Sequence, residues 1–141
     1  MQINFYPLFI DGGFASILEE SGIEERNEGV EAQFIACPSD PVKRAAWNAV
    51  QDELMSLPRP SYKRVVDHID HAVSIAGIDH VGIGSDFDGI EVTPDGLEDI
   101  SFMPLIFDVM RSRGYSEEDI EKVAGGNFLR LLRHVSLSSG E

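Results

Sequence analysis

Apolar positions in the second half of the chain follow the spacing of helices and of one buried strand. Residues 65–76 carry apolar side chains at helical intervals, and Gly77 follows them as a stop signal. The next segment, residues 78–85, is short, largely apolar and bounded by turn residues, which is typical of a buried strand. A helix that leads into a strand through a short link predicts an α/β fold.

Two more helical regions are predicted after this strand. The first begins at Met103 or Pro104 and ends at Gly114. The second begins at Ser116, because Asp119 lies at the spacing of a capping box, and we expect the glycine pair at 125–126 to divide it in two. Residues 136–141 are predicted to form a frayed tail.

The first sixty residues give weaker signals. Residues 2–6 predict a short buried strand closed by Pro7. Asp40 followed by Pro41 predicts the cap and first turn of a helix that runs past residue 50. The remainder is acidic and lacks a clear period, so residues 11–59 are interpreted as a variable insertion with one good helix.

Composition narrows the class of protein. A chain of 141 residues suffices for one small domain, but a complete (β/α)₈ barrel takes roughly 250. The net charge of −14, with no cluster of Lys and Arg, argues against a nucleic-acid partner. The single cysteine, Cys37, excludes an internal disulfide and a cysteine-based zinc cage. No apolar stretch is long enough for a membrane segment and no basic leader precedes one, so we expect a cytoplasmic protein.

The richest candidate for chemistry is the segment Gly82–Gly89. It lacks the third glycine of a dinucleotide fingerprint, the lysine of a P-loop and the ligand spacing of an EF-hand. Asp86 follows the predicted strand, at the edge where α/β barrels assemble their active sites, so it is a candidate acid or base. The alternative is structural, since Asp86 or Asp88 could accept backbone N–H bonds within its own turn.

A second cluster comprises Asp67, His68, Asp70 and His71. On a helix these side chains share a face that could hold a metal ion. The segment lacks the full His-Glu-x-x-His spacing, however, and its helix precedes a strand. We therefore favour histidines that hydrogen-bond to neighbouring carboxylates or to the backbone.

Several long stretches closely resemble the renal (membrane) dipeptidase family of zinc peptidases. They are residues 66–71 and 76–89, continued by 96–99 and 126–130, while Asn4-Phe5-Tyr6 is similar to a strand segment that precedes them in the family. The similarity covers about residues 2–10 and 60–135.

The resemblance implies a fold and a cofactor. Members fold as a (β/α)₈ barrel of the metal-dependent hydrolase type and cleave dipeptides with two zinc ions. The chain would be the carboxyl-terminal portion of that single barrel domain, namely about the last two βα units with the terminal helices. It would begin at Met1 inside the seventh strand. The family's metal ligands all precede that strand, so the resemblance implies that this chain holds no zinc ligand.

The resemblance also assigns site residues. Asp86 matches the aspartate that ends the eighth strand, which handles the proton of the bridging water and the leaving amine and helps to hold the substrate's amino end. Asp88, Gly89 and Tyr6 are expected at the pocket rim. The family's substrate-clamping arginine lies upstream, and neither Arg64 nor Arg130 takes its place.

Two functions are therefore in competition. The first is a zinc dipeptidase fragment that acts on dipeptides and requires a missing amino-terminal half, with a homo-oligomer as the alternative partner. The second is a non-catalytic interaction module, or a structural remnant of a dipeptidase, in which the acidic residues 11–59 cover the exposed edge of the sheet.

Overall fold

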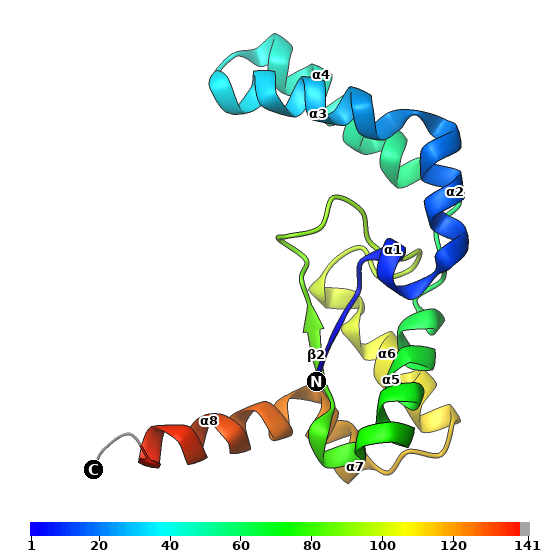
Figure 1. The fold of residues 1–141 in the computed structure, drawn as a ribbon, viewed down its shortest axis with the longest axis vertical. Coiled ribbons are helices and arrows are strands. Elements are labelled where there is room, and N and C mark those ends of the chain that lie inside the picture. The colour runs from blue at the N-terminus through cyan, green and yellow to red at the C-terminus, as the bar shows by residue number, and fades with distance from the viewer. Residues whose placement is uncertain (139–141) are drawn as a thin grey trace.

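Residues 1–138 are described by the computed structural model, and most of them are helical (Figure 1). The sheet consists of β1 (Gln2–Asn4) and β2 (Gly82–Ser85). The helices, in chain order, are α1 (Pro7–Ile10), α2 (Gly12–Ser21), α3 (Ile23–Ala36), α4 (Pro41–Ser56), α5 (Lys63–Ala76), α6 (Met103–Ser112), α7 (Glu117–Glu121) and α8 (Asn127–Ser138). Short 3₁₀ turns span Ile78–His80 and Ile100–Phe102, and a π turn spans Lys122–Gly126.

The two strands are parallel, and their register is irregular. Ile3 lies opposite Ile83, but Asn4 lies opposite Ser85, so β2 advances two residues while β1 advances one. Such an irregularity bends the strand and redirects its side chains. Both strands are shorter than the sequence predicts. Pro7 begins α1, since proline is favoured in the first turn of a helix, and residues 78–80 form a turn closed by His80 N and Gly77 O at 3.1 Å.

A core behind the sheet holds β1, β2, α5 and α6 together. The predicted helix over residues 65–76 is confirmed as α5, which ends before Gly77 with φ of 84°. Its buried side chains pack with those of the strands and of α6. The main members are Ile3, Phe5, Val65, Val66, Ile69, Val81, Ile106 and Met110. This core fixes the position of the strand ends, where the candidate site lies.

The helices α2, α3 and α4 form a second, smaller core of Phe14, Leu18, Ile23, Leu54 and Val92. The prediction of a single helix within residues 11–59 is wrong, because residues 12–36 are helical as well. The sequence signal was weak since α3 buries only Ile23 and Asn27 along its 14 residues. The predicted cap of α4 is confirmed, with Asp40 accepting from the N–H groups of Val42 and Lys43.

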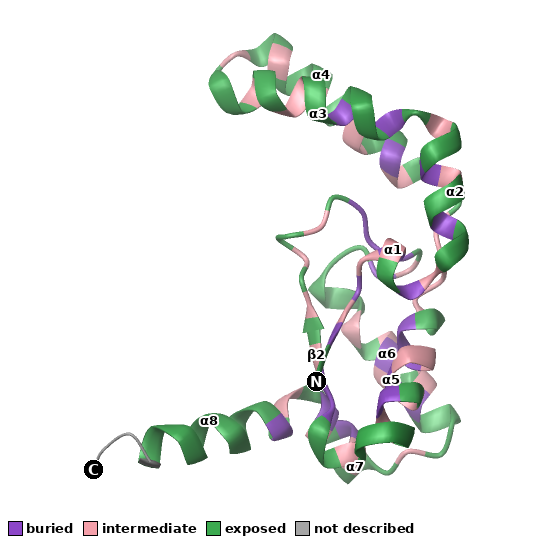
Figure 2. Ribbon diagram, viewed as in Figure 1, coloured by how far each residue is buried: buried purple, intermediate pink, exposed green. Residues whose placement is uncertain are grey.

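The pair α3 and α4 projects away from the sheet, at the far end of the molecule (Figure 1). Most of its residues are exposed (Figure 2). The expectation that residues 11–59 cover the sheet edge is therefore wrong, because α3 packs against α4 and their shared core lies on α2 and Val92. A helical hairpin with its own small core cannot also lie across the distant strands.

The last helical region is divided near the glycine pair at 125–126, as predicted. Ser116 and Asp119 form the expected capping box at the start of α7, and the backbone changes direction at Gly125 before α8. The predicted frayed tail is wrong for residues 136–138, which continue α8, whereas residues 139–141 lie outside the described part of the chain. Within residues 1–138 no helix has the length and apolar character of a membrane crossing.

Candidate active site

The candidate site lies where β2 ends. Ser85 and Asp86 have φ of 48° and 74°, in the left-handed region, which L residues rarely adopt. Such a conformation costs roughly 1–2 kcal/mol per residue, although aspartate tolerates it better than most. The conformation turns the chain sharply after the strand and leaves Asp86 exposed at the surface. Strain of this kind persists only where surrounding contacts determine the backbone.

The carboxylate of Asp86 is held from the neighbouring strand. Its Oδ2 accepts a hydrogen bond from Asn4 Nδ2 at 2.9 Å, between residues 82 positions apart in the sequence. Asn4 is held in turn by the backbone, because Tyr6 N donates to its Oδ1 at 2.7 Å. The sequence also allows a structural role for Asp86, in which its carboxylate accepts hydrogen bonds from backbone N–H groups of its own turn. Here that turn is closed by the backbone itself, with Gly89 N donating to Asp86 O at 2.9 Å.

Gly89 packs directly against the same carboxylate. A Cβ atom at this position would lie 2.3 Å from Asp86 Oδ1, which is closer than Cβ atoms come to other atoms in proteins, and 3.0 Å from its Cγ. Phe87, between them, is anchored by an edge-on contact with Phe5, with ring centroids 5.6 Å apart. The turn therefore fixes Asp86 from two sides, by Asn4 and by Gly89.

Two hollows flank the chain just beyond this turn. One, of about 320 Å³, is lined by Asp88 and Gly89 together with Glu31, Trp47, Gln51, Ile90 and Glu91. The other, of about 190 Å³, is lined by Tyr6 and Glu91 together with Leu18, Ile23, Glu24, Asn27, Glu28, Leu54 and Val92. Glu91 is common to both. The structure thus gathers Asp86, Asp88 and Gly89 on one turn and places Tyr6 in the adjoining hollow.

Tyr6 is electrostatically coupled to this acidic surface. Burial raises the pKa of its hydroxyl to about 12, and the nearby charge and hydrogen bond of Glu91 add to the effect. Tyr6 therefore stays protonated through the neutral range and can act as a hydrogen-bond donor.

Sequence reasoning missed Asn4, Glu91 and Trp47. Asn4 could have been found, because parallel strands end at one edge of a sheet and Asn4 ends the strand that pairs with β2. No comparable signal existed for Trp47, which approaches the turn only through the unforeseen packing of α3 and α4.

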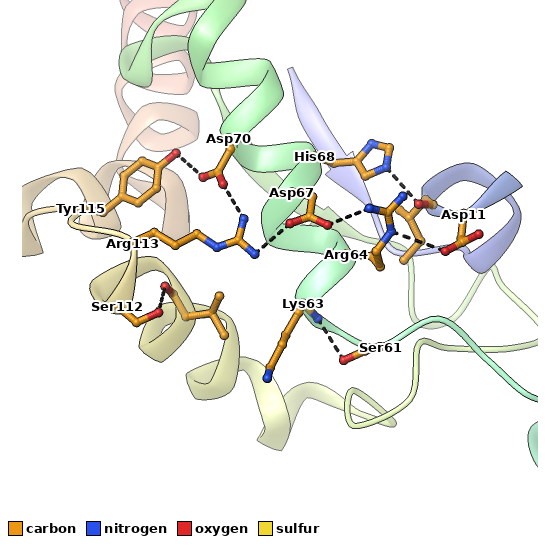
Figure 3. Close-up of polar contacts among 12 residues, drawn as sticks. Asp11, Ser61, Lys63, Arg64, Asp67, His68, Asp70, Ser112, Arg113 and Tyr115 are labelled. Atoms are coloured by element: carbon orange, nitrogen blue, oxygen red, sulfur yellow. Dashed lines mark hydrogen bonds and ion pairs between the residues drawn. The ribbon is translucent and has the colours of Figure 1, made fainter. Parts of the chain in front are cut away.

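The carboxylates of α5 are engaged in ion pairs (Figure 3). Arg113 contacts both Asp67, at 2.8 Å, and Asp70, which also accepts a hydrogen bond from Tyr115 at 2.7 Å. Arg64 donates to the other oxygen of Asp67 at 2.8 Å. Burial raises the pKa of Asp67, but Arg113 and Arg64 outweigh that effect and hold the pKa below its ordinary value. These carboxylates serve to join α5 to the segment after α6.

The histidines of the same helix fit the non-metal interpretation. His68 Nε2 lies 3.1 Å from the carbonyl oxygen of Ile10, which ties α5 to α1 (Figure 3). His71 is exposed. Among residues 1–138 no group of three or more His, Cys, Asp or Glu side chains is placed to hold a metal ion. The residues present therefore do not fit a two-zinc centre.

Comparison with known proteins gives the family of this sequence. The family model described as membrane dipeptidase (peptidase family M19) matches residues 1–140. Dipeptidase ataJ of Aspergillus terreus is 55% identical over 73 residues, which are 51% of this chain and 18% of that protein. Human dipeptidase 3 is 42% identical over 71 residues, which are 50% of this chain and 14% of that protein.

One solved structure adds a likeness in three dimensions. It is the crystal structure of the probable dipeptidase PvdM from Pseudomonas aeruginosa, which is 31% identical and superimposes with a TM-score of 0.51. The match covers 78% of this chain and 32% of that one. The chain thus spans less than a third of the length of each of these three proteins.

Proposed function

The chain belongs to the membrane dipeptidase family, and from this membership we propose that it is the carboxyl-terminal portion of a dipeptidase barrel, in which Asp86 moves a proton during hydrolysis. The observation that carries the proposal is the geometry of Asp86. It follows a parallel strand, it is exposed, and its carboxylate is fixed by Asn4 and Gly89. A carboxylate held at that edge of an α/β sheet suits acid–base catalysis.

The proposed reaction is the hydrolysis of one peptide bond. The oxygen of water bonds to the carbonyl carbon, the C–N bond breaks, and one proton of the water ends on the leaving amine. Asp86 accepts that proton and returns it to the amine nitrogen, while Asp88, Gly89 and Tyr6 shape the surface around it. Zinc would be held by residues outside this chain, and there it would supply Lewis-acid chemistry toward the carbonyl group and the water.

Complementation tests this proposal. The 141-residue chain is co-expressed with the part of the Pseudomonas aeruginosa probable dipeptidase that lies outside its match to this chain. Hydrolysis of a panel of dipeptides is then compared with hydrolysis by the chain alone, both with zinc present. We expect activity only in the complemented sample, and Asp86→Asn to lower its kcat by roughly 100- to 10,000-fold, the usual contribution of an acid–base group.

Asp88→Asn is the matched control, because it removes an exposed carboxylate from the same turn. It is expected to change KM more than kcat. Complemented activity that survives Asp86→Asn unchanged would overturn the role of Asp86. An assembled pair that hydrolyses no dipeptide would overturn the proposed function.

One observation favours a second candidate, a non-catalytic interaction module. Most residues of the projecting pair α3 and α4 are exposed and therefore accessible to a partner, while the carboxylates of α5 are engaged by arginines. For such a module, Asp86→Asn leaves binding to any partner and thermal stability unchanged. The same complementation experiment therefore decides between the two candidates.

A further inference from the structure

We propose that Asn4 is a positioning residue for Asp86, one that orients its carboxylate without supplying a charge. This inference rests on the proposed function, because it concerns the group to which that proposal assigns proton transfer. Asn4 ends β1 and is partly buried, whereas Asp86 is exposed just after β2. The side chain that orients the carboxylate is therefore more shielded from water than the carboxylate itself.

The hydrogen-bond chain fixes the orientation of the Asn4 amide. Tyr6 N is a backbone donor and can only donate, so the Asn4 atom 2.7 Å away must be the oxygen. The other end of the amide is then the NH₂ group, and it points at Asp86 Oδ2, 2.9 Å away. The assignment of oxygen and nitrogen therefore follows from the network itself.

The irregular register of the sheet brings the two residues together. Because Asn4 lies opposite Ser85 and Ile3 opposite Ile83, β2 has one extra residue before its end. Asp86 then follows immediately, with positive φ, and Phe5 N donates to Ser85 O at 3.0 Å. The backbone thus holds both partners at the distance that the side-chain hydrogen bond requires.

Asn4 donates a hydrogen bond from a neutral amide to Asp86, whereas Asp67 and Asp70 are contacted by a positively charged arginine. Arg113 and Arg64 bring positive charge to Asp67 and stabilise its ionised form. The amide of Asn4 carries no net charge, so it orients Oδ2 of Asp86 without bringing a positive charge to it. A group that must accept and release a proton is better served by orientation alone than by an ion pair.

The first experiment tests the contact without any assay of activity. The full chain is labelled with ¹⁵N-asparagine, which gives side-chain amide signals from Asn4, Asn27, Asn48 and Asn127. We expect the Asn4 amide to shift on Asp86→Ala, which removes the acceptor, and to stay in place on Asp88→Ala, with the exposed Asn48 as reference. An Asn4 amide that ignores Asp86→Ala, or that shifts equally with both variants, would overturn the contact.

The second experiment tests the consequence in the complemented enzyme. Asn4→Leu keeps a similar volume but removes the donor, so we expect kcat to fall about tenfold to hundredfold while KM changes little. Gln2→Leu, on the exposed part of the same strand, is the control for disturbance of β1. The two possible failures are distinguishable. Absence of hydrolysis in the wild-type pair overturns the proposed function, whereas wild-type hydrolysis with an unchanged kcat in Asn4→Leu overturns only the positioning role.

Discussion

At the residue scale, the conformation of Asp86 depends on a residue that has no side chain. Gly89 allows the turn to fold back until its Cα lies beside the Asp86 carboxylate. Asn4 provides the directional contact from the other side. Since the backbone at Asp86 is left-handed, these contacts, together with the anchored Phe87, compensate for a conformation that few residues adopt unaided.

Gly89→Ala should displace the Asp86 carboxylate. The new Cβ would lie 2.3 Å from Oδ1, so either the side chain or the turn must move. In the complemented enzyme we expect kcat to fall by about tenfold or more, because misplacement of a catalytic group by about 1 Å can cost a hundredfold. The measurement is a comparison of kcat and of thermal unfolding between the two proteins.

Gly29→Ala is the control for this substitution. Gly29 lies within α3, and a Cβ atom there meets nothing within 4 Å. Alanine should stabilise the chain by up to about 1 kcal/mol through its higher helix propensity and leave kcat unchanged. Equal kcat in Gly89→Ala and Gly29→Ala would contradict the packing argument for Gly89.

At this scale, features set by neighbouring residues could be predicted from the sequence, whereas contacts between distant residues could not. The position of Asp86 directly after a strand could be predicted, because the strand pattern and the family motif are both local, whereas its role in the site stays a prediction. Asn4 contacts it across 82 positions of sequence, and the contact depends on an irregular register that no local pattern reveals. Gly89 could be placed at the rim but not against the carboxylate, since that closeness arises from the turn geometry.

At the scale of elements, α5 is held by its core face and by charged contacts on its surface. Val65 and Ile69 are fully buried, as the helical spacing predicted, and Val66 is fully buried as well. Asp67 and Asp70 connect the same helix to Arg113 beyond α6 (Figure 3). The helix α3 could not be predicted in the same way, because its acidic surface leaves too few buried positions to show a period.

The Asp67 contacts predict a loss of stability in acid. The pKa of Asp67 is lower in the folded chain than its ordinary value of 3.8, so the unfolded state binds protons more readily as pH falls. The stabilisation is therefore present above about pH 4 and is lost as pH decreases through the folded pKa. We expect Asp67→Asn to lower the melting temperature at pH 7, and the gap to wild type to narrow below about pH 4.

Thermal unfolding followed by circular dichroism at several pH values measures this effect. Asp52→Asn, on the exposed surface of α4, controls for the removal of one negative charge from a chain of net charge −14. A constant gap between wild type and Asp67→Asn from pH 7 to pH 3 would contradict the assignment.

At the scale of the whole molecule, α8 is exposed along most of its length (Figure 2), and its exposed residues include large apolar side chains. Phe128, Leu131 and Leu132 are 52%, 57% and 50% exposed, at spacings that place them along one side of the helix. A pair of parallel strands also has unpaired backbone groups at its outer edges. The resemblance to the dipeptidase family was available from sequence, but the direction in which α8 projects was not, because it depends on the backbone at Gly125.

This exposed surface predicts self-association of the chain when it is expressed alone. Contiguous apolar surface of this kind is rarely left in water by monomeric proteins. We expect the sedimentation coefficient to rise with protein concentration, and Leu131→Glu to reduce the rise. Ile75→Glu, at a side chain 72% exposed on α5, should have a smaller effect. A monomer at every concentration would contradict this prediction.

The proposed function also predicts the metal content of the chain. A bridged zinc pair needs several ligands that converge, and within residues 1–138 the carboxylates of α5 face arginines while His68 faces a backbone carbonyl. After dialysis against trace zinc we expect elemental analysis to find far less than one zinc ion per chain. The complemented pair is expected to retain about two, the number that a bridged centre requires. Two zinc ions in the chain alone, lost on substitution of both His68 and His71 by alanine, would instead show that α5 rearranges to build a site of its own.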